Sequence, residues 1–306
     1  YYSTIIMDTV KLKPAVKSYI WGGTNLKKYG KESKEDVISE TWELSFHDDG
    51  LSLVDSGIYK GKTLKEVVKK DDLGTNVSTF TFFPCLIKLI DSASPLSVQV
   101  HPSDEYALKN ENSYGKTEMW YILDHEKDAG IYVGFKNNET QSDVEKALNN
   151  GTILDKLNFF KVKKGECYFI KSGTIHAIGK GVTLIEIQQN SNLTYRLYDY
   201  NRKDKNGNTR ELHISKALKV IDYNKYVPIT FNEGIIGTCK YFTSKKVEFK
   251  NEYVIENDEK SFSSITFIDG LGTVNDIKFK KYDTFFVPAN KKAIIKGNGE
   301  FIITKV

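Results

Sequence analysis

Hydrophobic residues in this chain recur mainly at alternate positions or in short runs. Most of the runs are rich in Val, Ile, Tyr, Phe and Thr, and Gly, Asn and Asp interrupt them. This arrangement is typical of many short β-strands. Helical spacing of apolar residues occurs in segments 62–70, 103–110, 142–149 and 212–222. The pattern therefore predicts a mainly β protein with few helices.

Local signals refine the predicted helices and one turn. Ser142 with Glu145 three residues later predicts a capping box at the start of the third helix. The segment 203–209 is rich in Lys, Asn, Asp and Gly and is expected to be an exposed turn. The fourth predicted helix carries one apolar stripe, made by Ile214, Ala217, Leu218 and Ile221.

Four polar side chains with metal-ligand chemistry occur on segments with strand patterns. Gln99 and His101 are two residues apart at the end of a strand-like run, so alternation directs both side chains to one face. Glu118 supplies negative charge, and His176 follows a glycine-containing turn. Two nitrogen and two oxygen ligands suit zinc, and manganese, iron or cobalt as well. We therefore predict that these four residues bind one divalent metal ion and leave room for water or substrate.

The other three histidines, His47, His125 and His213, are expected to be structural, because a lone histidine usually serves as a hydrogen-bonding residue.

Two lysines are candidates for contacts with a phosphate or a hydroxyl group. Lys116 is expected to share a strand face with Glu118. Lys88 interrupts an apolar run, which is costly unless its charge faces a polar cavity. The alternative for each is a solvated lysine on an edge strand.

The chain has only three arginines, Arg196, Arg202 and Arg210, and all occur in one short stretch. A guanidinium offers a planar, permanently charged fork that grips phosphate or a sugar oxyanion with two bonds. Ion pairing with Asp199 or Glu211 is the alternative for Arg202 and Arg210.

Several motifs resemble those of known families. Residues 165–176 resemble the second cupin motif, a strand and a glycine turn followed by a histidine, although Lys171 stands where that motif usually has proline. Gln99-Val100-His101-Pro102, Lys116-Thr117-Glu118 and the distant His176 resemble the type I phosphomannose isomerases, in which Gln, His, Glu and His bind one zinc ion. Further similarity covers nearly the whole chain, at 19–23, 40–43, 83–89, Glu186 and Arg196. Thr117 and Arg202 depart from the longer members, so the chain resembles the short bacterial form.

This resemblance implies a zinc-dependent aldose–ketose isomerase that interconverts mannose 6-phosphate and fructose 6-phosphate through a cis-enediol. It implies one Zn²⁺ per chain, a small phosphorylated sugar as substrate, and a monomer or homodimer. Arg196 is expected to hold or polarise the reacting oxygens. Glu186 is the first choice for the general base, and Lys116 or Lys88 could serve instead. A metal-assisted hydride shift stays open.

A weak internal repeat suggests the domain organisation. Residues 160–170 can be laid over 277–287, and continuing without a gap places Ala293 where the first copy has His176. We therefore expect two cupin-like (jelly-roll) β-barrels, with the helices inserted in and packed beside the catalytic barrel. Residues 1–225 would form the catalytic domain, and 226–306 a degenerate domain without metal. Chance similarity of two strand–turn segments is the alternative.

Composition narrows the class of protein further. The chain has 306 residues, 40% of them hydrophobic, which is enough for one large or two modest cores. A net charge of +4 favours no nucleic-acid partner. No segment approaches the roughly 18 apolar residues of a membrane span, and Tyr1–Met7 lacks a secretory pattern. The three cysteines, Cys85, Cys167 and Cys239, are expected to be buried thiols, so a cytoplasmic location is predicted.

Two other functional classes stay open. A cupin with two histidines, one glutamate and an open coordination position could be an iron dioxygenase. A non-catalytic sugar-binding cupin would bind a ligand without turnover. The glutamine at position 99 argues against the first class, and the lysines and arginines near the site argue against the second.

Overall fold

The structure, a computed structural model, describes residues 7–306 and divides them into two compact units. Lys17–Glu40 and Leu89–Thr230 form one unit, which we call the site unit. Thr41–Lys88 and Phe231–Val306, with the described part of Tyr1–Val16, form the other, which we call the C-terminal unit. The expectation about a secretory pattern falls almost entirely on residues 1–6, outside the described residues.

The site unit is built on a five-stranded antiparallel sheet with the strand order β13-β6-β11-β8-β9. Its strands are β6 (Val98–Val100), β8 (Gly130–Phe135), β9 (Leu157–Lys161), β11 (His176–Ile178) and β13 (Tyr195–Tyr198). Because strand side chains alternate, Val98, Val100 and Ala177 lie on one face of the sheet. Their neighbours Gln99 and His176, which are paired with each other, lie on the opposite face.

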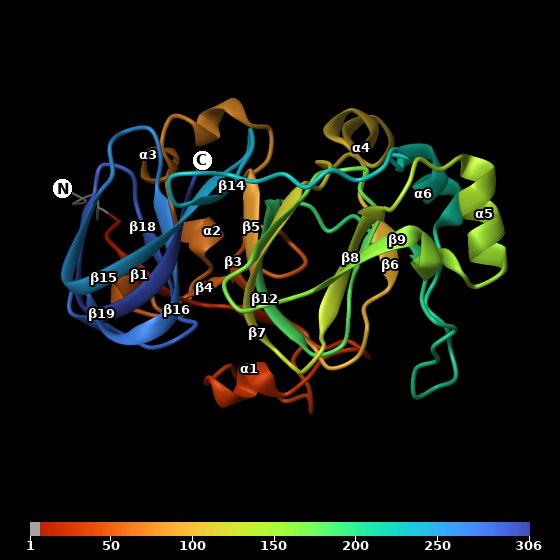
Figure 1. Cartoon of the computed structure of the whole chain (residues 1–306). Coiled ribbons are helices and arrows are strands. Elements are labelled where there is room, and N and C mark those ends of the chain that lie inside the picture. Colours follow the sequence, from red (N-terminus) through yellow and green to blue (C-terminus); the bar gives the residue numbers. More distant parts are fainter. Residues whose placement is uncertain (1–6) are drawn as a thin grey trace. The chain divides into compact units, whose positions relative to one another are not determined.

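Helices cover the first face of this sheet. Helices α5 (Gln141–Asn149) and α6 (Ile214–Val220) lie side by side at the right of Figure 1 and pack apolar residues against the sheet. The predicted apolar stripe of 212–222 is confirmed, since its members join this core. Helix α4 (Asp104–Asn110) begins after Ser103, whose hydroxyl accepts a hydrogen bond from the Tyr106 amide.

A second group of antiparallel strands faces the other side of the five-stranded sheet. Strand β7 (Glu118–His125) pairs with β10 (Cys167–Ile170) and with β12 (Val182–Gln189). Trp120, Ile122 and Leu184 from these strands form one hydrophobic core with Ile131 and Val133 from β8. The site unit therefore has side chains from two groups of strands meeting in its interior.

Two details of the predicted helices are wrong. The capping box of α5 is formed by Thr140 and Asp143, so the helix begins at Gln141, and Glu145 instead accepts a hydrogen bond from Gln141. The predicted helix over 62–70 is only one turn long, α2 (Leu64–Val67). Residues 61–63 are held by hydrogen bonds to the chain around Val54, and Val68 is extended.

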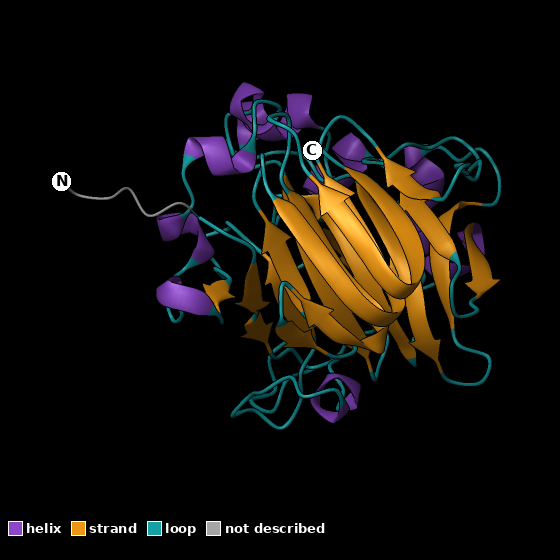
Figure 2. Cartoon of the chain, turned by 90° about the vertical axis from the view of Figure 1, so that its left-hand side faces the viewer, coloured by secondary structure: helices purple, strands orange, loops and turns teal. Residues whose placement is uncertain are grey.

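The C-terminal unit contains an eight-stranded sheet with the order β14-β15-β19-β16-β18-β1-β4 and β17 paired to β16. Figure 2 shows its long strands side by side. Phenylalanines fill its core, and the rings of Phe267 and Phe279 stack with centroids 3.6 Å apart. The strands are β1 (Val10–Lys13), β4 (Leu53–Val54), β14 (Ile235–Thr238), β15 (Thr243–Glu256), β16 (Ser263–Val274), β17 (Ile277–Phe279), β18 (Thr284–Val287) and β19 (Lys292–Lys305).

The remaining elements are short or cross the division between the units. Strands β2 (Ala15–Lys17), β3 (Glu40–Leu44) and β5 (Cys85–Ser92) each have residues in both units. The others are α1 (Asn25–Lys28), α3 (Lys70–Leu73) and the 3₁₀ turns η1 (Gly57–Tyr59), η2 (Val77–Thr79) and η3 (Ile153–Lys156). The mainly β prediction is confirmed. Within residues 7–306, every helix is too short or too polar to cross a lipid bilayer.

The three cysteines differ in exposure, and residues 203–209 form a turn. The expectation of three buried thiols is right for Cys85 and wrong for Cys167, which lies at the outward-facing start of β10. Cys239 is half-buried. The segment 203–209 forms the expected exposed turn, closed by a bridge between its end residues.

Candidate metal centre and active site

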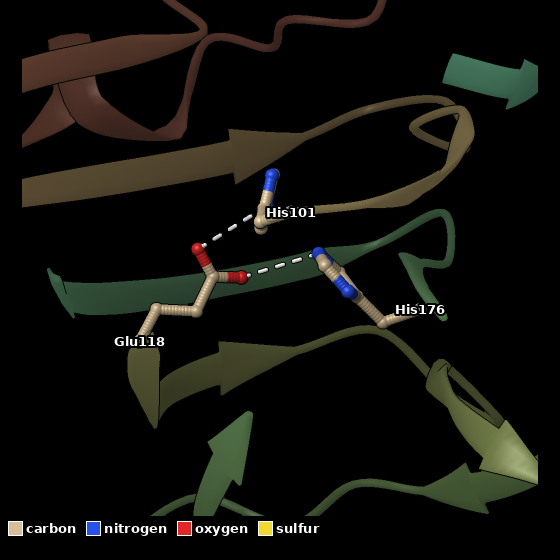
Figure 3. Close-up of side chains that lie close together, drawn as sticks. All are labelled: His101, Glu118 and His176. Atoms are coloured by element: carbon tan, nitrogen blue, oxygen red, sulfur yellow. Dashed lines mark ion pairs between the residues drawn. The ribbon is translucent and has the colours of Figure 1, made fainter. Parts of the chain in front are cut away.

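Three of the four predicted metal ligands meet in the interior of the site unit. His101, Glu118 and His176 are almost fully buried, and their ligand atoms all lie within 4.8 Å of one another. Glu118 Oε1 lies 3.2 Å from His176 Nε2, and Glu118 Oε2 lies 3.5 Å from His101 Nε2. Figure 3 shows the three side chains turned toward one point from separate segments of the chain.

Each of these residues stands where its backbone is held firmly. His176 begins β11 and is paired directly with Gln99 of β6. His101 follows β6, and its carbonyl accepts a hydrogen bond from the Gly173 amide, which ties it to the turn before His176. Glu118 begins β7, between β10 and β12. Three strand ends therefore fix the cluster, which makes it a preorganised site.

The cluster is rich in hydrogen-bond acceptors that lack donors. His176 Nδ1 lies 2.8 Å from the Thr174 carbonyl oxygen, and because a carbonyl only accepts, Nδ1 carries the proton. The Nε2 lone pair of His176 then faces Glu118, both of whose carboxylate oxygens are buried without a hydrogen-bond partner. Buried acceptors left without donors are costly. A divalent cation among them would satisfy all of them, so the residues fit a metal ion.

The protonation states suit the same purpose. Burial by itself would raise the pKa of the Glu118 carboxyl, but the charge of Lys116 beside it opposes burial, and the pKa lies well below its ordinary value. Burial, together with the charge of Lys116, lowers the pKa of His101 well below its ordinary value. The carboxylate is therefore charged and the His101 ring neutral at neutral pH, as metal ligands must be.

Gln99 and Arg196 lie on the same face of the sheet as His176. In the strand register Gln99 is directly opposite His176 on one side and Arg196 on the other. Residues directly opposite each other in an antiparallel pair place their side chains on one face. The structure therefore brings the predicted fourth ligand and the predicted catalytic arginine to the face that carries the cluster.

Hydrogen bonds from the segment around Glu211 and His213 hold Arg196, and the sequence pattern did not predict them. The His213 amide donates to the Arg196 carbonyl over 2.7 Å, and His213 Nδ1 accepts from the Arg196 amide over 3.1 Å. The guanidinium donates from Nη1 to the Glu211 carbonyl, 2.7 Å away. His213 thus makes local hydrogen bonds, as expected for a structural histidine, but those bonds hold a candidate functional residue.

Arg202 and Arg210 follow the ion-pair alternative. Both donate to the buried carboxylate of Asp199, and Arg210 does so through Nε and Nη2 at 2.8 Å and 2.6 Å. Arg202 also donates to Ser94 and to the Pro95 carbonyl. These contacts indicate a structural role for both guanidiniums, because they hold the segment after β13 in place.

The candidate base Glu186 is in the interior of the site unit and is buried. It lies opposite Trp120 in the β12–β7 register, and the Trp120 indole N–H donates to Glu186 Oε2 over 2.9 Å. The Trp120 ring also meets the His176 ring edge to face, with centroids 5.5 Å apart. Strand alternation places Trp120 on the same face as Glu118, but alternation alone does not predict this hydrogen bond.

The two candidate lysines are both buried, which excludes the solvated alternative for each. Lys116 Nζ lies 3.6 Å from Glu118 Oε2, so its predicted closeness to Glu118 is confirmed. Lys88 belongs to the C-terminal unit, where its Nζ lies 4.8 Å from the centroid of the Trp42 ring. Its participation in the site stays a prediction.

The chain is thus an antiparallel β protein whose interior carries a His–Glu–His cluster that could hold a metal ion. Residues 9–139 match the family model described as "Phosphomannose isomerase type I, catalytic domain". The chain is 38% identical to mannose-6-phosphate isomerase ManA of Bacillus subtilis (strain 168), over 90% of this chain and 91% of ManA. It therefore belongs to the type I phosphomannose isomerase family.

Solved structures agree with this assignment. The crystal structure of a mannose 6-phosphate isomerase from Bacillus subtilis matches with a TM-score of 0.87 and 34% identity, over 98% of this chain and all of that one. A mannose 6-phosphate isomerase bound with zinc and yttrium matches with a TM-score of 0.76 over 97% of this chain and 99% of that one. At 17% identity this second match supports the fold alone.

Proposed function

We propose that this chain is a zinc-dependent isomerase that interconverts mannose 6-phosphate and fructose 6-phosphate. The observation that carries the proposal is the buried cluster of His101, Glu118 and His176, whose acceptor atoms converge without donors. It occurs in a member of a family whose relatives are named for this reaction. Family membership supports the substrate, and the cluster supports the chemistry.

Gln99, His101, Glu118 and His176 would hold one Zn²⁺ per chain. Two imidazoles, a carboxylate and an amide oxygen are ligands that zinc accepts. We choose zinc because the motifs around these residues resemble those of the type I phosphomannose isomerases, in which Gln, His, Glu and His bind one zinc ion. A divalent ion held there supplies Lewis-acid stabilisation of negative charge on the sugar oxygens, which is worth several kcal/mol.

The chain's own residues would move the proton. In the cis-enediol route that we propose, the open sugar loses a proton from C2 and gains one at C1, while one hydroxyl proton is transferred from O2 to O1. Glu186 is buried and held by Trp120, so it is our choice for the base that takes the proton from C2 and returns it to C1. Arg196, on the same sheet face as His176, would hold the oxygens on which charge develops.

Lys116 is our candidate for a contact with the phosphate or a sugar hydroxyl, and Lys88 is a second. The burial of Lys116 beside Glu118 supports a role inside the site. The only support for a role of Lys88 is that its side chain is buried. Either lysine could replace Glu186 as the base, and variants of each distinguish these roles.

The division into a catalytic domain, 1–225, and a degenerate domain, 226–306, is also our proposal, with each domain a cupin-like barrel. The repeat falls on comparable elements, because β9, β10 and β11 correspond to β17, β18 and β19. Ala293, the counterpart of His176, is fully buried among phenylalanines. In the folded structure, however, residues 41–88 belong to the same compact unit as the C-terminal strands. A monomer or homodimer and a cytoplasmic location stay predictions.

A coupled assay for fructose 6-phosphate tests the proposal. Purified protein is expected to turn over mannose 6-phosphate, to lose activity with a chelator and to regain it with Zn²⁺. His176→Ala is expected to lose both the metal and the activity. His125→Ala alters an exposed histidine at the far end of β7 and serves as the matched control, with metal and turnover retained.

Three outcomes would contradict the proposal. Full metal content in His176→Ala would remove the proposed metal site. Metal binding with sugar binding but no turnover would indicate the non-catalytic class. Oxygen consumption with an iron-loaded protein and no isomerisation would indicate the oxygenase class.

A further inference from the structure

Trp120 connects two of the residues that the proposed reaction requires. Its side chain is fully buried in the middle of the site unit. The indole Nε1–H donates to Glu186 Oε2 over 2.9 Å. The ring meets the His176 imidazole edge to face, at 5.5 Å between centroids and 69° between planes.

The chemistry of an indole suits such a role. Its N–H is a donor only, and it usually finds a partner when the ring is buried. The side chain has two rotatable bonds, so a packed ring holds its N–H in one direction. Two features set the direction of the Trp120 N–H. The ring packs against Ile122, Leu184 and other apolar residues, and Trp120 lies directly opposite Glu186 in the paired strands.

We propose that Trp120 is a positioning residue, which fixes the Glu186 carboxylate for proton transfer and supports the orientation of the His176 ring. A hydrogen bond to a carboxylate is stronger than one between neutral groups. It restricts rotation of the carboxylate about its last bond, and a base must hold its orientation during transfer. The inference deepens the proposed function and rests on the assignment of Glu186 as the base.

Trp120→Phe tests this inference, because phenylalanine keeps an aromatic ring but has no N–H. Losing a hydrogen bond to a charged group is expected to lower kcat roughly 10- to 100-fold. KM should change little and the metal content should stay at the wild-type level. Trp21→Phe is the matched control, since Trp21 is buried in the same hydrophobic core. Its kcat should stay within about twofold of wild type.

A double variant separates positioning from general damage. On a Glu186→Gln background there is no base left to position, so adding Trp120→Phe should cost little further activity. An equal loss of kcat in both backgrounds would overturn the inference, because a structural effect is independent of Glu186. Wild-type turnover in Glu186→Gln would also overturn it and would leave the isomerase assignment intact. A wild-type protein without any turnover would instead refute the proposed function.

Tryptophan emission gives a readout that does not depend on activity. Co²⁺ bound beside His176 should quench Trp120, so titrating Co²⁺ into metal-free protein should lower the emission of wild type and of Trp21→Phe. Trp120→Phe should lose most of this quenching. Undiminished quenching in Trp120→Phe would overturn the placement of Trp120 beside the metal ligand.

Glu186→Leu keeps the inference testable if Trp120→Phe does not fold. Removal of the acceptor leaves the indole in an apolar environment, so the Trp120 emission, isolated in a Trp21→Phe/Trp42→Phe background, should move to shorter wavelength. Unchanged emission would contradict the Trp120–Glu186 hydrogen bond.

Discussion

Acidification should destabilise the metal-free protein through His101, and the size of the effect can be worked out. The ring is buried and its pKa is well below the ordinary value of 6.5, so the folded protein keeps it neutral where the unfolded chain protonates it. Unfolding therefore takes up a proton, and the free energy of unfolding falls as the pH falls below the unfolded pKa. The stability linked to this group is fully present above that value.

The magnitude follows from the unfolded chain alone. An ordinary histidine goes from about one-tenth to about nine-tenths protonated between about pH 7.5 and pH 5.5. Integrating proton uptake over this window gives a loss of about 1.4 kcal/mol. The lowered pKa of Glu118 acts in the same direction, but only around and below its ordinary value of 4.5, outside the window.

Urea unfolding of metal-free wild type and His101→Gln at both pH values measures this effect. Glutamine does not titrate, so the wild type should lose about 1.4 kcal/mol more than the variant between the two conditions. His125→Gln changes an exposed ring and should behave as the wild type does. Equal losses in wild type and His101→Gln would refute the argument that burial keeps the ring neutral.

Three further predictions follow from the site and the cores. Arg196→Lys keeps the charge but not the planar fork, so steady-state kinetics should show transition-state stabilisation reduced by about 2–4 kcal/mol, mainly in kcat, with metal content unchanged; a near wild-type kcat would remove Arg196 from the catalytic residues. Anomalous scattering from crystals should show one metal peak, beside Glu118, and a second peak beside Ala293 would contradict the degenerate repeat. Phe267→Ala empties part of the aromatic core of the C-terminal unit and should lower the free energy of unfolding by about 3–5 kcal/mol; a loss below about 1 kcal/mol would indicate that this core tolerates a cavity.

Local pattern predicted the mainly β class and the approximate positions of α4, α5 and α6. Alternation predicted that Gln99 lies on a ligand face, and the register places it opposite His176. The apolar stripe of α6 was predicted because helical periodicity is a property of neighbouring residues. The two wrong helix predictions arose where one local signal competed with another. Thr140 caps α5 two residues before the predicted Ser142, and pairing near Val54 takes up the start of the predicted helix at 62–70.

Patterns within the chain were enough to predict the mainly β class, the separation of ligand-bearing segments by turns and, through the resemblance, the family. Most of the contacts between polar side chains became visible only in the folded protein. Arg202 and Arg210 pair with Asp199, His213 braces Arg196, and Trp120 donates to Glu186. Strand periodicity fixes the face on which a side chain lies, because it is local. Contacts across paired strands and facing sheets depend on register and packing, which no single segment encodes.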